Sequence, residues 1–188
     1  MVTTDVLWRA WDGRGIEHLR LDVGPDAVRA DSLIVSVDEG RPFRARYALE
    51  CDAAWRLRLA RIDVLGDPTR VMELHVDSGR WSDARSGATL PLDGCVDIDI
   101  YPSPFTNTLP IRRLAGTTVG QPVRITVAWV RLPALTIHAA PQEYTLLERG
   151  AAGGRWRFRA LDSDFTAELH VDAQGVVRDY PEIARRIL

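Results

Sequence analysis

Apolar and polar residues alternate with a period of two along most of the chain. The alternation is clearest over residues 19–23, 55–59, 123–129 and 155–160. Because successive side chains of a β-strand point to opposite faces, this pattern predicts strands that are buried on one face. Each run is short and ends in Gly, Pro or Asp, which is typical of antiparallel strands joined by turns.

The alternation changes phase once, after Leu59. The apolar positions then become Ala60, Ile62 and Val64. A shift by one residue would turn the apolar side chains of a strand to the wrong face of the sheet. We therefore predict a β-bulge near Leu59–Ala60.

The C-terminus is the one segment that the sequence predicts as a helix. Asp179 is a suitable N-cap, and Pro181 lies near the first helical position. Arg185 and Arg186 lie at the end where the helix dipole favours cations. Such a short helix is not stable alone in water, so we expect it to pack on the sheet.

Two segments of the chain carry the same landmarks in the same order. Residues 47–77 and 144–172 each begin with a tyrosine, contain a Trp-Arg pair and end in Glu-Leu-His-Val-Asp. We interpret them as an internal duplication within a single domain, residues 1–188, with halves of roughly 16–94 and 95–188. Two such halves predict one strongly curved antiparallel sheet, a half-barrel or barrel with room for a ligand in its concavity.

Composition and charge exclude several classes of partner. The formal net charge of −2 gives no reason to expect a nucleic-acid partner, and all 24 cationic side chains are arginines. No apolar run reaches the ~18 residues of a membrane span. The first residues lack the features of a signal peptide, so we expect a cytoplasmic protein. No motif for a metal or cofactor occurs, so neither is expected, and the sequence indicates no oligomeric state.

The segment of residues 95–114 combines a predicted strand with two carboxylates. Asp97 and Asp99 lie on one face of this strand, with Cα atoms ~6.5–7 Å apart, and three aliphatic residues take the other face. Two neighbouring carboxylates can serve as an acid/base pair, hold a cation or pair with arginines.

Two consecutive arginines, Arg112 and Arg113, close the same segment. We expect one of them to pair with Asp97 or Asp99 across adjacent strands. The pairing should lower the pKa values of both aspartates and keep them ionised, which makes them poor general acids.

A turn bounded by prolines lies between the aspartates and the arginines. It carries Phe105, Thr106 and Asn107, and we expect Pro110 to end it. Polar groups beside an aromatic ring are a common arrangement for recognising a ligand. The alternative is a structural turn, in which Asn107 bonds its own backbone and Phe105 fills the core.

Residues 95–114, the tripeptide at 142–144 and residues 171–181 together resemble the bacterial family called putative glycolipid-binding proteins. The resemblance implies a lipid-like or glycolipid-like ligand, which we expect to bind without turnover in the concavity of the sheet. The alternatives are an enzyme with Asp97 or Asp99 as acid/base, and an interaction scaffold without a small ligand. The predicted ligand-binding residues are Asp97, Asp99, Phe105, Thr106, Asn107, Arg112, Arg113, Tyr144 and, at the cavity rim, Trp81.

Overall fold

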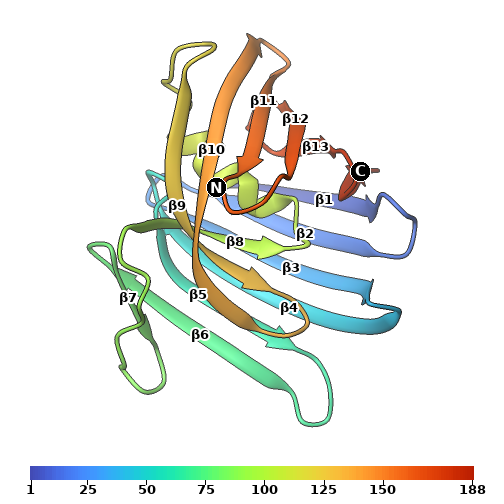
Figure 1. Cartoon of the computed structure of the whole chain (residues 1–188), viewed down its shortest axis with the longest axis vertical. Coiled ribbons are helices and arrows are strands. Elements are labelled where there is room, and N and C mark those ends of the chain that lie inside the picture. Colours follow the sequence, from blue (N-terminus) through green and yellow to red (C-terminus); the bar gives the residue numbers. More distant parts are fainter.

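The computed structural model describes residues 1–188, and nearly all of its regular secondary structure is β-strand (Figure 1). The strands are β1 (Val2–Ala10), β2 (Ile16–Val23), β3 (Ala27–Asp38), β4 (Arg41–Asp52), β5 (Leu57–Val64), β6 (Arg70–Asp77), β7 (Arg80–Asp83), β8 (Cys95–Tyr101), β9 (Pro122–Arg131), β10 (Thr136–Gly150), β11 (Gly153–Ala160), β12 (Thr166–Asp172), β13 (Val177–Tyr180) and β14 (Ala184–Arg186). A 3₁₀ helix, η1 (Phe105–Asn107), leads directly into the short helix α1 (Thr108–Arg113). The predicted mainly β fold is confirmed.

All fourteen strands form one sheet, in the order β7-β6-β5-β4-β3-β2-β1-β14-β13-β12-β11-β10-β9-β8. Neighbouring strands are antiparallel except for β8 and β9, which run parallel. The sheet is strongly curved, and its two end strands, β7 and β8, do not pair with each other (Figure 1). The predicted curvature is therefore confirmed, and the sheet is open rather than closed on itself.

The helical segment packs inside the curved sheet and contributes to both hydrophobic clusters of the core. Phe105 and Leu109 belong to the larger cluster of 30 buried residues. Ile111 belongs to the smaller cluster of 10, together with Tyr144 and Phe158. Every residue from Phe105 to Ile111 is buried, so this segment fills the concavity and leaves only part of it free for a ligand.

The prediction that Pro110 ends a turn is wrong, because Pro110 is the third residue of α1. The first residues of a helix have N–H groups without an intrahelical partner, so a proline in the first turn removes no hydrogen bond. The prolines at 104 and 110 therefore lie where a helix tolerates them, and the segment is helical rather than a loop.

The predicted C-terminal helix is also wrong. The chain instead forms β13 and β14, joined by a turn in which Glu182 has a φ of 68°. β14 pairs with β1, where Trp8 is opposite Arg186 and Ala10 is opposite Ala184. These backbone hydrogen bonds join the first and last strands of the chain, and their gain outweighs the weak local signals for a short helix.

The strands of the proposed duplication occur in matching order, with β4–β6 corresponding to β10–β12. The predicted bulge lies close to its expected place: Leu57 and Leu59 pair with successive residues of β4, and Arg58 is the extra residue. The register shift in the second half lies on β10, which corresponds to β4 and not to β5, and Leu147 is the extra residue there. The duplication itself stays a prediction.

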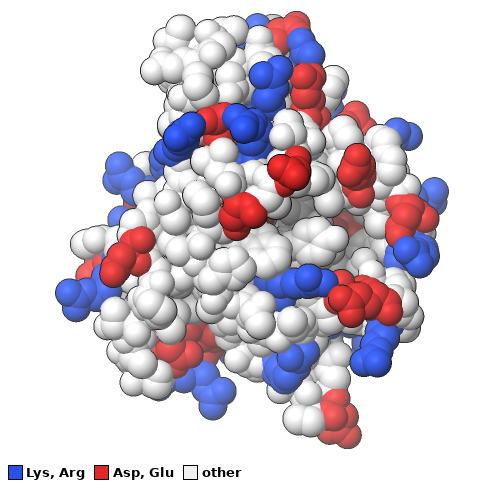
Figure 2. Space-filling model, in the orientation of Figure 1, with Lys and Arg blue, Asp and Glu red and all other residues white.

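The surface carries charges of both signs. Figure 2 shows that Arg side chains and carboxylates are interspersed over this face, without a large area of one sign. Many of them form pairs across neighbouring strands, such as Arg61 with Glu73 and Arg155 with Glu168. Exposed pairs of this kind contribute little stability each, ~0–1 kcal/mol.

Candidate functional site

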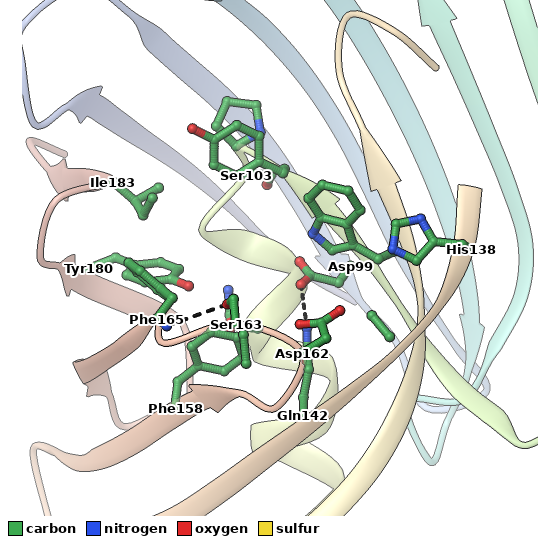
Figure 3. Close-up of a pocket in the computed structure, with 16 residues that line it drawn as sticks. Asp99, Ser103, His138, Gln142, Phe158, Asp162, Ser163, Phe165, Tyr180 and Ile183 are labelled. Atoms are coloured by element: carbon green, nitrogen blue, oxygen red, sulfur yellow. Dashed lines mark hydrogen bonds between the residues drawn. The ribbon is translucent and has the colours of Figure 1, made fainter. Parts of the chain in front are cut away.

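A cavity of about 350 Å³ lies beside the helical segment, between β8, β10, β11 and the turn from β13 to β14 (Figure 3). One wall is aromatic and consists of Phe158, Phe165 and Tyr180. Their ring centroids are 6.0–6.2 Å apart with tilted or edge-on planes, which is favourable geometry for aromatic packing. The three rings come from β11, the loop after β11 and β13, so the wall forms only when these strands assemble.

The opposite wall is built around Trp129 of β9. Its ring centroid lies 5.1 Å from that of His138 on β10 and 6.4 Å from that of Tyr101 at the end of β8. His138 and Tyr101 are exposed, whereas Trp129 is partly buried. A flat ligand group entering the cavity therefore meets aromatic rings on both sides.

The floor of the cavity is polar and centres on Asp99. Gln142 donates from Nε2 to Oδ2 of Asp99 at 2.6 Å, and Thr106 donates from Oγ1 to Oδ1 at 3.0 Å. Burial raises the pKa of Asp99, although the hydrogen bonds from Gln142 and Thr106 act in the opposite direction. The carboxyl group is thus held in one orientation and faces the cavity (Figure 3).

Asn107 supplies the second fixed polar group of the floor. It is only 2% exposed, and its Oδ1 accepts a hydrogen bond from the Tyr144 hydroxyl at 2.9 Å. Asn107 lines the cavity, and its Nδ2 donates to no protein group. Tyr144 itself is buried behind the floor, so its role is to orient the amide. An amide N–H in this position is available to a ligand oxygen.

The predicted pairing of an aspartate with an arginine is present between Asp97 and Arg113. Arg113 donates from Nη2 to Oδ2 of Asp97 at 2.6 Å, and Asp97 is fully buried. Arg113 lies on α1, not on an adjacent strand as predicted, because the segment is helical. Asp97 does not line the cavity. Because Asp97 lies on β8 and Arg113 on α1, the pair holds the helix against this strand.

The predicted lowering of both aspartate pKa values is wrong. Burial raises the pKa of Asp97, and the hydrogen bond and charge of Arg113 only partly oppose this effect. Asp99 has no arginine partner, and burial raises its pKa as well. The sequence indicates that opposite charges are close together, but the cost of removing a carboxylate from water depends on packing that the sequence does not show.

Three other predicted residues lie away from the cavity. Trp81 is 1% exposed and donates from Nε1 to the Cys95 carbonyl at 3.0 Å, so the predicted place at a cavity rim is wrong. Phe105 is fully buried in the larger hydrophobic cluster, as the alternative interpretation expects. Arg112 is exposed and lies 5.0 Å from the ring centroid of Trp55.

Several cavity residues were not recognised from the sequence. The most important of these are Trp129, Gln142, Phe158, Asp162, Phe165 and Tyr180. Gln142 and Tyr180 fall within the segments that carry the family resemblance. That resemblance is the only feature of the sequence that could have indicated a role for them in the site. The aromatic residues follow the same alternation as core residues, so nothing in the sequence distinguishes them as cavity walls.

A buried carboxylate behind the cavity was also missed. Glu17 of β2 is 5% exposed, and its Oε1 accepts hydrogen bonds from Ser32, Tyr47 and Ser103 at 2.6–2.8 Å. Ser103 lines the cavity, but its Oγ also accepts from the backbone N–H of Phe105 at 3.2 Å. The Ser103 hydroxyl thus donates to Glu17 and accepts from Phe105, so the network fixes the start of the helical segment.

We expect Glu17→Gln to be more stable than the wild type at neutral pH and to lose this advantage in acid. Burial raises the pKa of Glu17, whereas glutamine keeps an accepting oxygen without a charge to desolvate. Since the folded pKa exceeds the unfolded value, the wild type takes up a proton on folding, and its stability rises as the pH falls through the folded pKa. The difference in the free energy of unfolding between the two proteins changes by at most ~1.4 kcal/mol per pH unit. Melting both proteins between pH 7.5 and 4.5 checks this; a difference in Tm that does not vary with pH would contradict it.

Three further features bear on the class of protein. No helix is long and apolar enough to cross a membrane. No group of three or more His, Cys, Asp or Glu side chains is arranged to hold a metal ion. Cys51 and Cys95 are buried free thiols, and burial raises their pKa values to about 12 and about 11.

The fold and the cavity define an all-β protein with one curved, open sheet that encloses a small site with aromatic walls and a polar floor. The chain belongs to the family described as "Putative glycolipid-binding", which matches residues 5–186. The family resemblance predicted from the sequence is confirmed.

The fold is similar to the crystal structure, at 1.80 Å resolution, of a DUF1089 family protein from Pseudomonas aeruginosa. The two chains are 40% identical, the TM-score is 0.81, and the match covers 93% of this chain and 92% of the other. No curated protein matches the chain significantly.

Proposed function

We propose that the protein binds a glycolipid-like molecule without chemically changing it, and that the cavity beside Asp99 holds the sugar head group. The observation that carries the proposal is the combination of facing aromatic walls with buried polar groups that have hydrogen-bonding capacity to spare. Asn107 Nδ2 makes no hydrogen bond within the protein, and Tyr180, 7% exposed, makes none through its hydroxyl. Both residues border the cavity, so these hydrogen-bonding positions are open to a ligand.

The size of the cavity favours a head group over a whole lipid. At about 350 Å³ it lies at the small end of the range for ligand sites, ~300–1,000 Å³. Ala140, Ala160 and Ile183 are the aliphatic residues among its lining. They offer an apolar surface to the first part of an alkyl chain, while a sugar ring packs against the aromatic rings.

This proposal revises the expected ligand-binding residues. Of the predicted residues, Asp99 and Asn107 line the cavity, whereas Thr106 and Tyr144 support them from behind. Arg112 and the Asp97–Arg113 pair contribute stability or surface charge instead, as their positions away from the cavity indicate.

An alkyl glucoside below its critical micelle concentration tests the proposal. We expect saturable binding by calorimetry, together with a change in tryptophan fluorescence because Trp129 lines the cavity. Tyr180→Phe removes one hydroxyl and should weaken binding ~3–10-fold, and Trp129→Ala should weaken it at least ~10-fold. Trp11→Ala is the matched control, since Trp11 is 46% exposed and lies outside this cavity.

The same mixtures distinguish binding from catalysis. After prolonged incubation, mass spectrometry should recover the glucoside intact. Release of glucose that Asp99→Asn abolishes would overturn the proposal and favour the enzyme alternative, because Asp99 is the partly buried carboxyl group with a raised pKa in this cavity. Equal affinity of the wild type, Tyr180→Phe and Trp129→Ala would show that the ligand binds elsewhere.

A further inference from the structure

We infer that the head group held in this cavity carries a protonated amine, as in an amino sugar, rather than a phosphate or a carboxylate. The inference rests on the proposed function, because it specifies the chemical class of the ligand at the same site. It follows from the charges around the cavity, the free acceptor positions of Asp99 and the aromatic walls.

The charges that line the cavity are acidic. Asp99 and Asp162 both face it, and His138 is the one lining residue that can carry a positive charge (Figure 3). No arginine lines the cavity, although the protein has 24 of them. An anionic head group would therefore meet like charges and no fixed cation, which disfavours it.

Neither carboxylate has an arginine partner, in contrast to a neighbouring acidic residue. Glu143, which follows Gln142 on the same strand, pairs with Arg124 and Arg159 at 3.1 and 3.0 Å. Asp99 is bonded only to neutral groups, and Asp162 forms no ion pair. The negative charge at the cavity is thus left without compensation from the protein.

Asp99 has room to accept further hydrogen bonds. Each of its oxygens accepts one hydrogen bond from the protein, from Thr106 at Oδ1 and from Gln142 at Oδ2. An ionised carboxylate offers about four acceptor positions, so roughly two remain for a ligand. An ammonium group is a donor with three N–H bonds, and hydrogen bonds between charged groups are stronger than neutral ones.

The aromatic walls favour the same kind of ligand. The faces of Trp and Tyr rings attract cations, and the attraction increases when the cation is removed from water. Trp129 packs beside His138, and His138 and Tyr180 lie on opposite sides of the cavity whose floor carries Asp99 (Figure 3). A carboxylate surrounded by aromatic rings is a common arrangement for binding an ammonium group, whereas a neutral sugar uses the rings and leaves the charge of Asp99 unpaired.

Three alkyl glycosides with the same alkyl chain test the inference: one of glucose, one of glucosamine and one of N-acetylglucosamine. We expect the wild type to bind the glucosamine compound at least ~10-fold more tightly than the other two at pH 7, with a preference that decreases as salt is added. Asp99→Asn and Asp162→Asn should each reduce the preference to less than ~3-fold. Asp164→Asn is the matched control, because Asp164 lies on the same exposed loop but does not line the cavity.

The outcomes separate this inference from the proposed function. Equal binding of all three compounds would overturn the amine inference and leave glycolipid binding intact. An amine preference that survives both Asp99→Asn and Asp162→Asn would also overturn it, since the preference would then arise elsewhere. If the wild type binds none of the three compounds, the proposed function fails together with the inference that depends on it. Far-ultraviolet circular dichroism of each variant shows whether it is folded. If Asp99→Asn does not fold, Asp99→Ser replaces it.

Discussion

Replacing Arg113 with alanine is expected to destabilise the protein by ~3–5 kcal/mol. Asp97 is fully buried, and its Oδ1 already lacks a hydrogen-bond partner. The variant would remove the partner of Oδ2 as well and leave a buried charge without compensation. Urea denaturation at pH 7 measures the loss. Because Asp97 can avoid the cost by taking up a proton, the loss should decrease as the pH falls.

The neighbouring residue provides the control for this experiment. Arg112 is exposed, and its principal contact is with the ring of Trp55, so Arg112→Ala should cost only ~0.5–1 kcal/mol. A double variant, Asp97→Asn with Arg113→Ala, should recover part of the stability because it removes the buried charge. Equal effects of the two single arginine variants would show that the pair with Asp97 contributes nothing.

Replacing Trp81 with alanine should destabilise the protein by a similar amount, ~3–5 kcal/mol. The side chain is 1% exposed, belongs to the larger hydrophobic cluster and lies on the end strand β7. Its Nε1 donates to the carbonyl of Cys95, which begins β8 at the other end of the sheet. The substitution thus creates a cavity and also breaks a link between the two ends of the sheet.

Two further variants separate these contributions. Trp81→Phe keeps most of the apolar volume but loses the hydrogen bond, so it should cost ~1–2 kcal/mol. Trp11→Ala removes an exposed tryptophan that contacts Arg185 at 4.6 Å, and it should cost less than ~1 kcal/mol. Thermal and urea unfolding give the order of the effects. If Trp81→Ala unfolds like the wild type, the tryptophan does not hold the ends of the sheet together.

The sequence predicts the strands well because their signal is local. Alternation over five to eight residues is visible in the chain itself, and the phase change after Leu59 places a bulge close to the observed one at Arg58. The C-terminal strand β14 could not be predicted in the same way, because only its pairing with β1 and β13 makes three residues form a strand. The helical segment was missed because its prolines suggest a loop, although they occupy positions that a helix tolerates.

The candidate site shows the same limit. Asp99 and Asn107 were predicted because they belong to one short segment with unusual chemistry. Phe158, Phe165 and Tyr180 come together only through the curvature of the sheet, and each looks like an ordinary core residue in the sequence. The contact between Glu17 and Ser103 joins residues 86 positions apart, and no local pattern indicates it.

The curvature of the sheet is also fixed by the covalent chain. β7 and β8 lie at opposite ends of the strand order, yet only residues 84–94 connect them. If the fourteen strands lay flat, their ends would be ~62 Å apart at ~4.8 Å per neighbouring pair. A fully extended segment of this length reaches at most ~36–40 Å. The connection is therefore a tether that prevents the sheet from unrolling into a flat layer.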